Sequence, residues 1–176
     1  MNHPDTAGAP ARPALDDDTL DFARRVFQFA RAGETTELAT LFAQGLPRNL
    51  RNERGDSLLM LASYNGHADT TRLLLEQGAD PELQNDAGQT PLMGAAFKGD
   101  LAIATLLLDH GARVDGAGPD GRTALMFAAM FNRAEIVRLL LERGADAHAA
   151  DASGVTAAQA AQKMGAADTA ALLAQS

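Results

Sequence analysis

Residues 88–121 read GQTPLMGAAFKGDLAIATLLLDHGARVDGAGPDG. Thr90 can cap the N-terminus of a helix with its hydroxyl. Pro91 suits the first helical position, because the N–H that proline lacks would have no helical partner there. Gly99 supplies a residue that can end the helix in a left-handed conformation. These residues predict a first helix that starts after Thr90 and runs to Lys98.

A second helix is predicted directly after the first. Residues 101–110 have the length and the apolar content of a helix with one buried face, and Gly111 can close it. Residues 112–121 are too rich in Gly and Pro for regular structure. The stretch therefore predicts a helix, a turn, a second helix and an extended loop. One such helix pair cannot bury its apolar faces alone, so neighbouring pairs must stack to complete a core.

The same unit recurs every 33 residues. Three glycine series carry this period: Gly55, Gly88, Gly121 and Gly154; Gly45, Gly78, Gly111 and Gly144; and Gly33, Gly66, Gly99 and Gly165. The third series is interrupted only by Asn132, and Asn tolerates a left-handed backbone better than most residues. A leucine series has the same spacing: Leu41, Leu74, Leu107, Leu140 and Leu173. A 33-residue helical unit is therefore the basis of the fold, which is all-α.

Three phrases of the sequence resemble the ankyrin repeat. They are GDSLLMLASYNGHADTTRLLLEQGAD, GQTPLMGAAFKGDLAIATLLLDHGAR and GRTALMFAAMFNRAEIVRLLLERGAD, and the resemblance extends over about residues 20–176. It implies an ankyrin-repeat solenoid of about five helix-turn-helix units with short hairpin-like loops. It also implies a small, stand-alone bacterial member of that family.

The resemblance assigns roles to residues in each unit. Gly55, Gly88 and Gly121 match the family's hairpin glycine, and Ser57, Thr90 and Thr123 match its capping hydroxyl. The family's histidine is replaced by Met60, Met93 and Met126. We expect looser polar coupling between units at these three positions, offset by packing of the thioethers.

The ends of the chain depart from the repeat. We expect a disordered tail at 1–17 and a repeat domain at 18–176, with units at about 18–52, 53–85, 86–118, 119–151 and 152–176. The first and last units are expected to cap the stack, and the last has a more polar outer face. Asp18 or Thr19 is the expected N-cap of the first helix.

Composition limits the classes of partner. The 176 residues are 46% hydrophobic and carry a net charge of −8, which repels the phosphates of nucleic acids. The chain has no cysteine, and no run approaches the roughly 18 apolar residues that span a bilayer. We expect a cytoplasmic monomer that binds neither nucleic acid nor membrane.

No catalytic constellation emerges from the sequence. Ser57 and Ser63 have no His and Asp in a matching register, and no glycine is followed by the Lys-Ser/Thr of a phosphate-binding loop. The acidic run 16–18 complements a helix dipole more simply than it holds a metal. The histidines are scattered, and His67 stands where the family often has a structural histidine; they are His3, His67, His110 and His148. We therefore expect no enzyme activity, no cofactor and no metal site.

With no catalytic or metal site expected, the candidate functional feature is a protein-binding surface. The family resemblance implies a concave face made by the first helices and the loop tips, where ankyrin-like proteins bind other proteins. The expected contact residues at the helix ends are Tyr64, Asn65, Phe97, Lys98, Met130 and Phe131, and those of the polar loop rim are Asp56, Gln89 and Arg122. Aromatic residues within a polar rim are typical of an interaction hot spot. The alternative is that the large apolar residues pack against the loop of the next unit.

The sequence thus predicts a protein-binding module without catalysis of its own. A second hypothesis is a dedicated regulator or inhibitor of one neighbouring enzyme, because some small bacterial members of the family are encoded beside stress or toxin genes. A structural spacer and an enzyme are the hypotheses from other classes.

Overall fold

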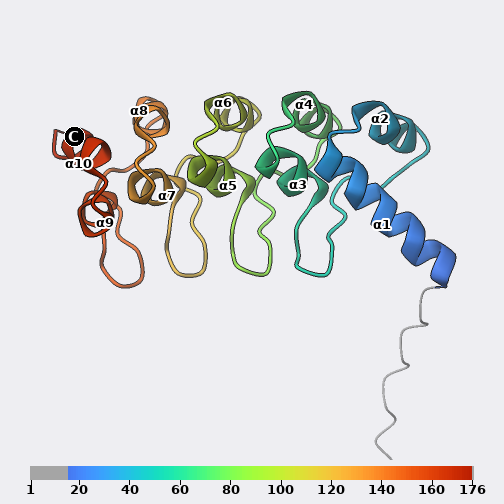
Figure 1. Ribbon diagram of the computed structural model, residues 1–176, viewed down its shortest axis with the longest axis horizontal. Coiled ribbons are helices and arrows are strands. Elements are labelled where there is room, and N and C mark those ends of the chain that lie inside the picture. Colours follow the sequence, from blue (N-terminus) through green and yellow to red (C-terminus); the bar gives the residue numbers. More distant parts are fainter. Residues whose placement is uncertain (1–15, 176) are drawn as a thin grey trace, which may run out of the picture.

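The computed structural model describes residues 16–175. Within this part of the chain, ten helices form five antiparallel pairs that stack side by side in two rows (Figure 1). The inner row consists of α1 (Asp17–Ala32), α3 (Leu58–Tyr64), α5 (Pro91–Lys98), α7 (Ala124–Met130) and α9 (Ala157–Met164). The outer row consists of α2 (Thr35–Ala43), α4 (Ala68–Glu76), α6 (Leu101–Asp109), α8 (Ala134–Glu142) and α10 (Ala167–Leu173). The extended loops between pairs project from one side as hairpins (Figure 1). The predicted all-α solenoid is confirmed.

Hydroxyl caps start the four inner helices that follow α1, as the sequence predicts. The Thr90 side chain accepts a hydrogen bond from the Met93 N–H at 3.3 Å, and Ser57, Thr123 and Thr156 cap their helices in the same way. The Thr90 N–H lies 3.5 Å from the Met93 sulfur, which occupies the acceptor position. The methionines that replace the family's histidine are all buried: Met60, Met93 and Met126. Met93 and Met126 belong to the core cluster.

The first helix begins earlier than expected. Asp16, and neither Asp18 nor Thr19, is the N-cap of α1, with its carboxylate 2.7 Å from the Thr19 N–H. Asp16 has the extended backbone of a cap, while Asp17 is already helical. Hydrogen bonding to Thr19 lowers the pKa of the Asp16 carboxyl. The expected tail, 1–17, therefore includes the N-cap Asp16 and the first helical residue Asp17, and residues 1–15 lie outside the described part of the chain.

Left-handed residues end the inner helices. Gly99 has φ 79°, and Asn132, the exception in the glycine series, has φ 56°. Asn132 also does what glycine cannot: its side-chain oxygen accepts hydrogen bonds from the N–H groups of Asp168 and Thr169, at 3.1 and 3.2 Å. The substitution thus keeps the turn and adds a bond to the next helix pair.

The core lies between the two rows. Each inner helix packs against the next inner helix, and each outer helix against the next outer helix. The leucine series supplies the centre of this core, with Leu74, Leu107 and Leu140 fully buried, Leu173 6% exposed and Leu41 half-buried at the first pair. The core is therefore continuous along the whole stack.

Polar contacts also join neighbouring pairs. The His67 ring is hydrogen-bonded to the Arg31 carbonyl at 2.8 Å, which confirms the structural interpretation of this histidine. Arg133 donates to the Phe97 carbonyl at 3.1 Å, and Arg51 donates to the Gln84 carbonyl at 2.8 Å. These bonds join successive pairs, and the bond of Arg51 joins two neighbouring hairpins.

Candidate functional site

The hairpins are built by side chains that accept hydrogen bonds from the loop backbone. The Asn52 oxygen accepts from the N–H groups of Arg54 and Asp56, both at 2.9 Å. Asn85 does the same in the next hairpin, and Asp151 does so in the last. These three loops are thereby held in a defined shape, whereas Gly118 occupies the same register position in the remaining hairpin.

The ends of α3, α5 and α7 place an aromatic row, Tyr64, Phe97, Met130 and Phe131, along the inner side of the stack. The rings of Tyr64 and Phe97 are stacked, with centroids 6.4 Å apart and planes 9° from parallel. Phe97 meets Phe131 edge to face, with centroids 4.5 Å apart. The ammonium of Lys98 lies 5.1 Å from the centre of the Tyr64 ring, within the range of a cation–π contact.

The aromatic row lines an inner groove of about 870 Å³ between the helix ends and the hairpins. Gly94 lies in the floor of this groove, where the 33-residue register places Leu61 and Phe127 in the neighbouring units. A Cβ at Gly94 would meet the Tyr64 ring at 3.3 Å. The missing side chain therefore keeps the groove open at its centre.

Eight of the nine predicted contact residues line the inner groove, and they come from three successive units: Asp56, Tyr64, Asn65, Gln89, Phe97, Arg122, Met130 and Phe131. Lys98 lies outside the lining and reaches the row only through the Tyr64 ring. Asn65 is exposed, but its amide donates to the Leu61 carbonyl at 2.7 Å and so ends α3. Gln89 is exposed at its hairpin.

Asp56 is a correction to the expected polar rim, because it is only 8% exposed. One carboxylate oxygen accepts from the Asn85 amide at 3.0 Å, and the other accepts from the Asn52 amide at 3.1 Å. Arg54 also lies 3.5 Å from this carboxylate. Asp56 therefore ties two hairpins together, and its oxygens are already occupied.

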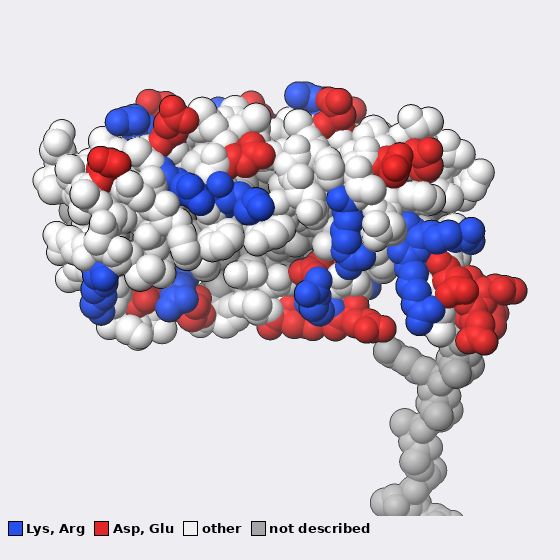
Figure 2. All heavy atoms as spheres, viewed as in Figure 1, with Lys and Arg blue, Asp and Glu red and all other residues white. Residues whose placement is uncertain are grey.

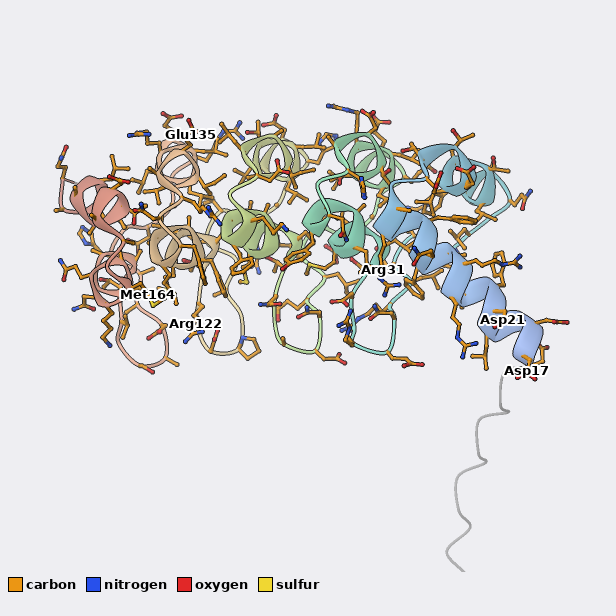
Figure 3. All side chains as sticks on the ribbon, in the orientation of Figure 1. Asp17, Asp21, Arg31, Arg122, Glu135 and Met164 are labelled. Atoms are coloured by element: carbon orange, nitrogen blue, oxygen red, sulfur yellow. The ribbon has the colours of Figure 1, made fainter. Side chains whose placement is uncertain are left out.

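Arg31 and Met164 are two residues at or beside the groove that the predicted set lacks, although the 33-residue register contains the signal for both. Arg31 occupies the register position of Tyr64 and Phe97, and it lines the groove at the α1 end. Met164 occupies the position of Phe131; it is 54% exposed and lines a smaller pocket beside the groove. Both belong to terminal units, where few other repeat features mark the register. Figure 3 shows Arg31 beside α3 and Met164 at the end of α9.

Asp151, in the last hairpin, is an aspartate with a lowered pKa, and it lies close to Arg122. The hydrogen bond from the Val155 N–H is the main cause that lowers the pKa of the Asp151 carboxyl. Burial acts in the opposite direction and raises the pKa. The hydrogen bond from the Ser153 N–H and the positive charges of Arg122 and Lys163 lower it further. The Arg122 guanidinium lies 4.0 Å from Asp151 and 3.5 Å from Asp120. The arginine at this end of the groove is thus partly neutralised.

Residues 16–175 contain neither a metal-binding cluster nor a membrane-spanning helix. No group of three or more His, Asp or Glu side chains in this range is arranged to hold a metal ion. No helix in the same range is long and apolar enough to cross a membrane. The arrangement of the inner groove provides aromatic, amide and guanidinium groups for binding.

Comparison with known proteins agrees with the architecture. The family described as ankyrin repeats (3 copies) matches residues 26–117 and 115–176. A protein of Pseudomonas aeruginosa PAO1, named as an ankyrin repeat protein, is 60% identical over 62 residues. That match covers 35% of this chain and 36% of the relative, so the chain is aligned with about a third of the relative's length. The 33-residue helix pairs, the hairpin glycines, the hydroxyl caps and the family match together show that this chain belongs to the ankyrin-repeat family.

Proposed function

We propose that this protein is a non-catalytic interaction module that binds a segment of a partner protein in the inner groove. The observation that carries the proposal is the aromatic row. Tyr64 is 40% exposed, and Phe97, Met130 and Phe131 are only partly buried. None of the four belongs to the core cluster within the described residues, nor to the apolar side chains packed against that cluster.

The chemistry of the groove supports a protein ligand. Ankyrin repeats are generally protein–protein interaction modules. Aromatic side chains supply large contact areas at low entropic cost, and interface hot spots are enriched in them. The rows of hydrogen bonds in the hairpins and the ring contacts between units hold these groups in place, so little ordering is needed when a partner binds.

The test begins with the partner. An affinity pull-down from the native source, analysed by quantitative mass spectrometry, compares the wild-type protein with a Phe97→Ala, Phe131→Ala double variant. Proteins retained only by the wild type are purified and titrated calorimetrically. Truncation of a hot-spot aromatic costs about 2 kcal/mol, so each single variant is expected to weaken binding roughly thirtyfold.

A control variant lies on the opposite row. Arg138 is exposed on α8, and Arg138→Ala is expected to leave the dissociation constant within a factor of about two. Since Phe97 and Phe131 touch edge to face, each truncation also removes about 1 kcal/mol of ring contact, and circular dichroism must show that the variants remain folded. Equal binding by wild type and by the folded double variant would contradict the proposed function.

A further inference from the structure

A second groove adjoins the first at the N-terminal end of the stack. It has a volume of about 750 Å³ and lies between α1 and the hairpin at 51–54. Four of the α1 residues that line it are spaced as one helical stripe: Leu20, Arg24, Phe27 and Arg31. Ala23, Arg25 and Gln28 of α1 also line it. In Figure 1, the N-terminal end of α1 extends away from the other helices of the stack toward the hairpin side.

This second groove, called the arginine groove below, is strongly basic in an otherwise acidic protein. Five arginines line it against one glutamate, Glu53; the arginines are Arg24, Arg25, Arg31, Arg51 and Arg54. Figure 2 shows the basic side chains gathered beside α1, with acidic side chains at the start of that helix and along the hairpin edge. The positive charge is therefore local and bordered by carboxylates.

The arginines differ in how far the fold already occupies them. The Arg51 guanidinium is already used in the fold, because it donates hydrogen bonds to the carbonyls of Gly55 and Gln84 at 2.9 and 2.8 Å. Arg24 pairs with Asp21 at 2.8 Å, but both side chains are more than two-thirds exposed, so solvent screens the pair. Arg25 and Arg31 form no ion pair with any residue of the described range. Their guanidinium groups are available to a ligand.

The arginine groove and the inner groove are continuous. Arg31, Glu53 and Arg54 line both of them. Beyond Arg31 the inner groove is lined by the aromatic row, starting with Tyr64, together with polar hairpin residues such as Gln89. A ligand that lies along both grooves therefore meets guanidinium groups at one end and aromatic rings at the other.

Resting on the function proposed above, we propose that the bound partner segment is acidic where it lies against α1 and apolar where it crosses the aromatic row. Guanidinium groups bind carboxylates through paired, charge-assisted hydrogen bonds, and Arg25 and Arg31 provide two such groups. Leu20 and Phe27 add apolar surface for the stems of acidic side chains or for one apolar neighbour.

A nucleic acid is the less suitable occupant. Its phosphates continue at regular intervals, so it requires positive charge along its whole path. Here the arginines are concentrated at the α1 end, and the one arginine farther along the groove, Arg122, pairs with Asp120 and Asp151. Asp17 and Asp21 on α1 and Asp86 in the groove lining add negative charge. A short acidic stretch of protein matches the limited basic region, whereas a polyphosphate strand would meet the bordering carboxylates.

A peptide selection tests both proposals even while the natural partner is unidentified. A phage library of random peptides is selected on the wild type, on Phe97→Ala, Phe131→Ala and on Arg25→Gln, Arg31→Gln. The wild type is expected to enrich peptides that carry Asp or Glu on one side of apolar residues. The arginine variant is expected to lose the acidic part of this motif and to keep the apolar part.

Synthetic peptides then measure how much the acidic residues contribute to the binding affinity. An enriched acidic peptide is compared with the same peptide carrying Gln and Asn in place of Glu and Asp. We expect the neutral peptide, or the Arg25→Gln, Arg31→Gln variant, to bind about tenfold more weakly, and added salt to remove the difference. Arg25→Lys, Arg31→Lys retains the charge but loses the paired geometry, and is expected to fall between the two.

The outcomes separate the two proposals. Enriched peptides that require Phe97 and Phe131 but show no acidic residues would overturn the acidic-segment proposal and leave the proposed function standing. If no peptide is enriched in a way that depends on the aromatic row, both are wrong. A labelled oligouridylate that binds the wild type as tightly as the acidic peptide, and is lost in Arg25→Gln, Arg31→Gln, would replace the acidic segment with nucleic acid.

Discussion

Thr71 carries a buried hydroxyl that the fold leaves without a hydrogen bond. The residue is 0% exposed, and its Oγ1 has no partner among the described residues. The 33-residue register places apolar residues at the same position of other units, including Val137 on α8. A hydroxyl in this position costs stability, because it lost its water on folding and regained no partner.

Replacing this hydroxyl with a methyl group should stabilise the protein. We expect Thr71→Val to raise the free energy of unfolding by about 1 kcal/mol, measured by urea denaturation. The neighbouring Thr70 is the matched control, because its hydroxyl lies 2.7 Å from that of Thr35. Thr70→Val should lower the free energy of unfolding by a similar amount. A destabilised Thr71→Val would mean that the hydroxyl has a partner after all.

Asp151 should make the free energy of unfolding depend on pH. The folded protein holds the pKa of this carboxyl below its ordinary value of 3.8, chiefly through the Val155 N–H. A lowered pKa means that the ionised form is favoured by folding, so its stabilisation is complete above pH 3.8 and is lost as the pH falls through the lower, folded value.

The variant Asp151→Asn removes the negative charge and is expected to keep the hydrogen bonds that shape the hairpin. Asn52 and Asn85 make the same backbone bonds in their hairpins, so asparagine fits the position. We expect the variant to stay folded and to lose less stability than the wild type between about pH 5 and pH 2. The measurement is thermal unfolding across that range. Parallel curves for the two proteins would show that Asp151 does not contribute.

At the scale of one element, α6 shows which side of a helix carries the stability. Leu107 is 0% exposed, and its helix packs between α4 and α8, whereas Leu101 of the same helix is 39% exposed. Leu107→Ala should lower the free energy of unfolding by roughly 2–5 kcal/mol, because it leaves a cavity in the continuous core. Leu101→Ala should change it by no more than about 0.5 kcal/mol.

Denaturant unfolding of the two leucine variants checks the register as well as the helix. Both substitutions remove the same atoms and have similar effects on helix propensity, so their difference measures burial. If the two variants unfold at the same denaturant concentration, the assignment of Leu107 to the core series is wrong.

At the scale of the whole molecule, each helix pair depends on its neighbour. α9 packs on α7, and α10 packs on α8. Deleting 152–176 should expose the apolar faces of α7 and α8 and cause fraying or aggregation. Size-exclusion chromatography with light scattering and a melting curve measure the effect. A truncated protein that stays monomeric and equally stable would contradict the role of the last pair as a cap.

Deleting 1–15 is the comparison for that truncation. The cut stops before Asp16, which caps α1, so the first described helix keeps its N-terminal hydrogen bond. We expect the melting temperature to change little. Unfolding after this deletion would mean that the first pair depends on the segment before Asp16.

Much of this molecule was predictable because its decisive interactions are local. Thr90, Pro91 and Gly99 predict α5 to the residue, since a cap, a first-turn proline and a left-handed terminus act within one helix. The 33-residue period then predicts the stack, because a helix pair with one apolar face must bury it against a copy of itself. Asn132 was predictable for the same reason, from the backbone conformation its position requires.

Only the tertiary structure determined which polar groups are free. Asp56 looks like an exposed rim residue in the sequence, yet Asn85 of the next hairpin buries and occupies it. Arg31 and Arg54 belong to different units, and they line one groove because α1 extends past the hairpin. Caps and turns depend on neighbours along the chain, whereas burial and the pairing of charges depend on contacts between residues about 30 positions apart, which local preferences do not encode.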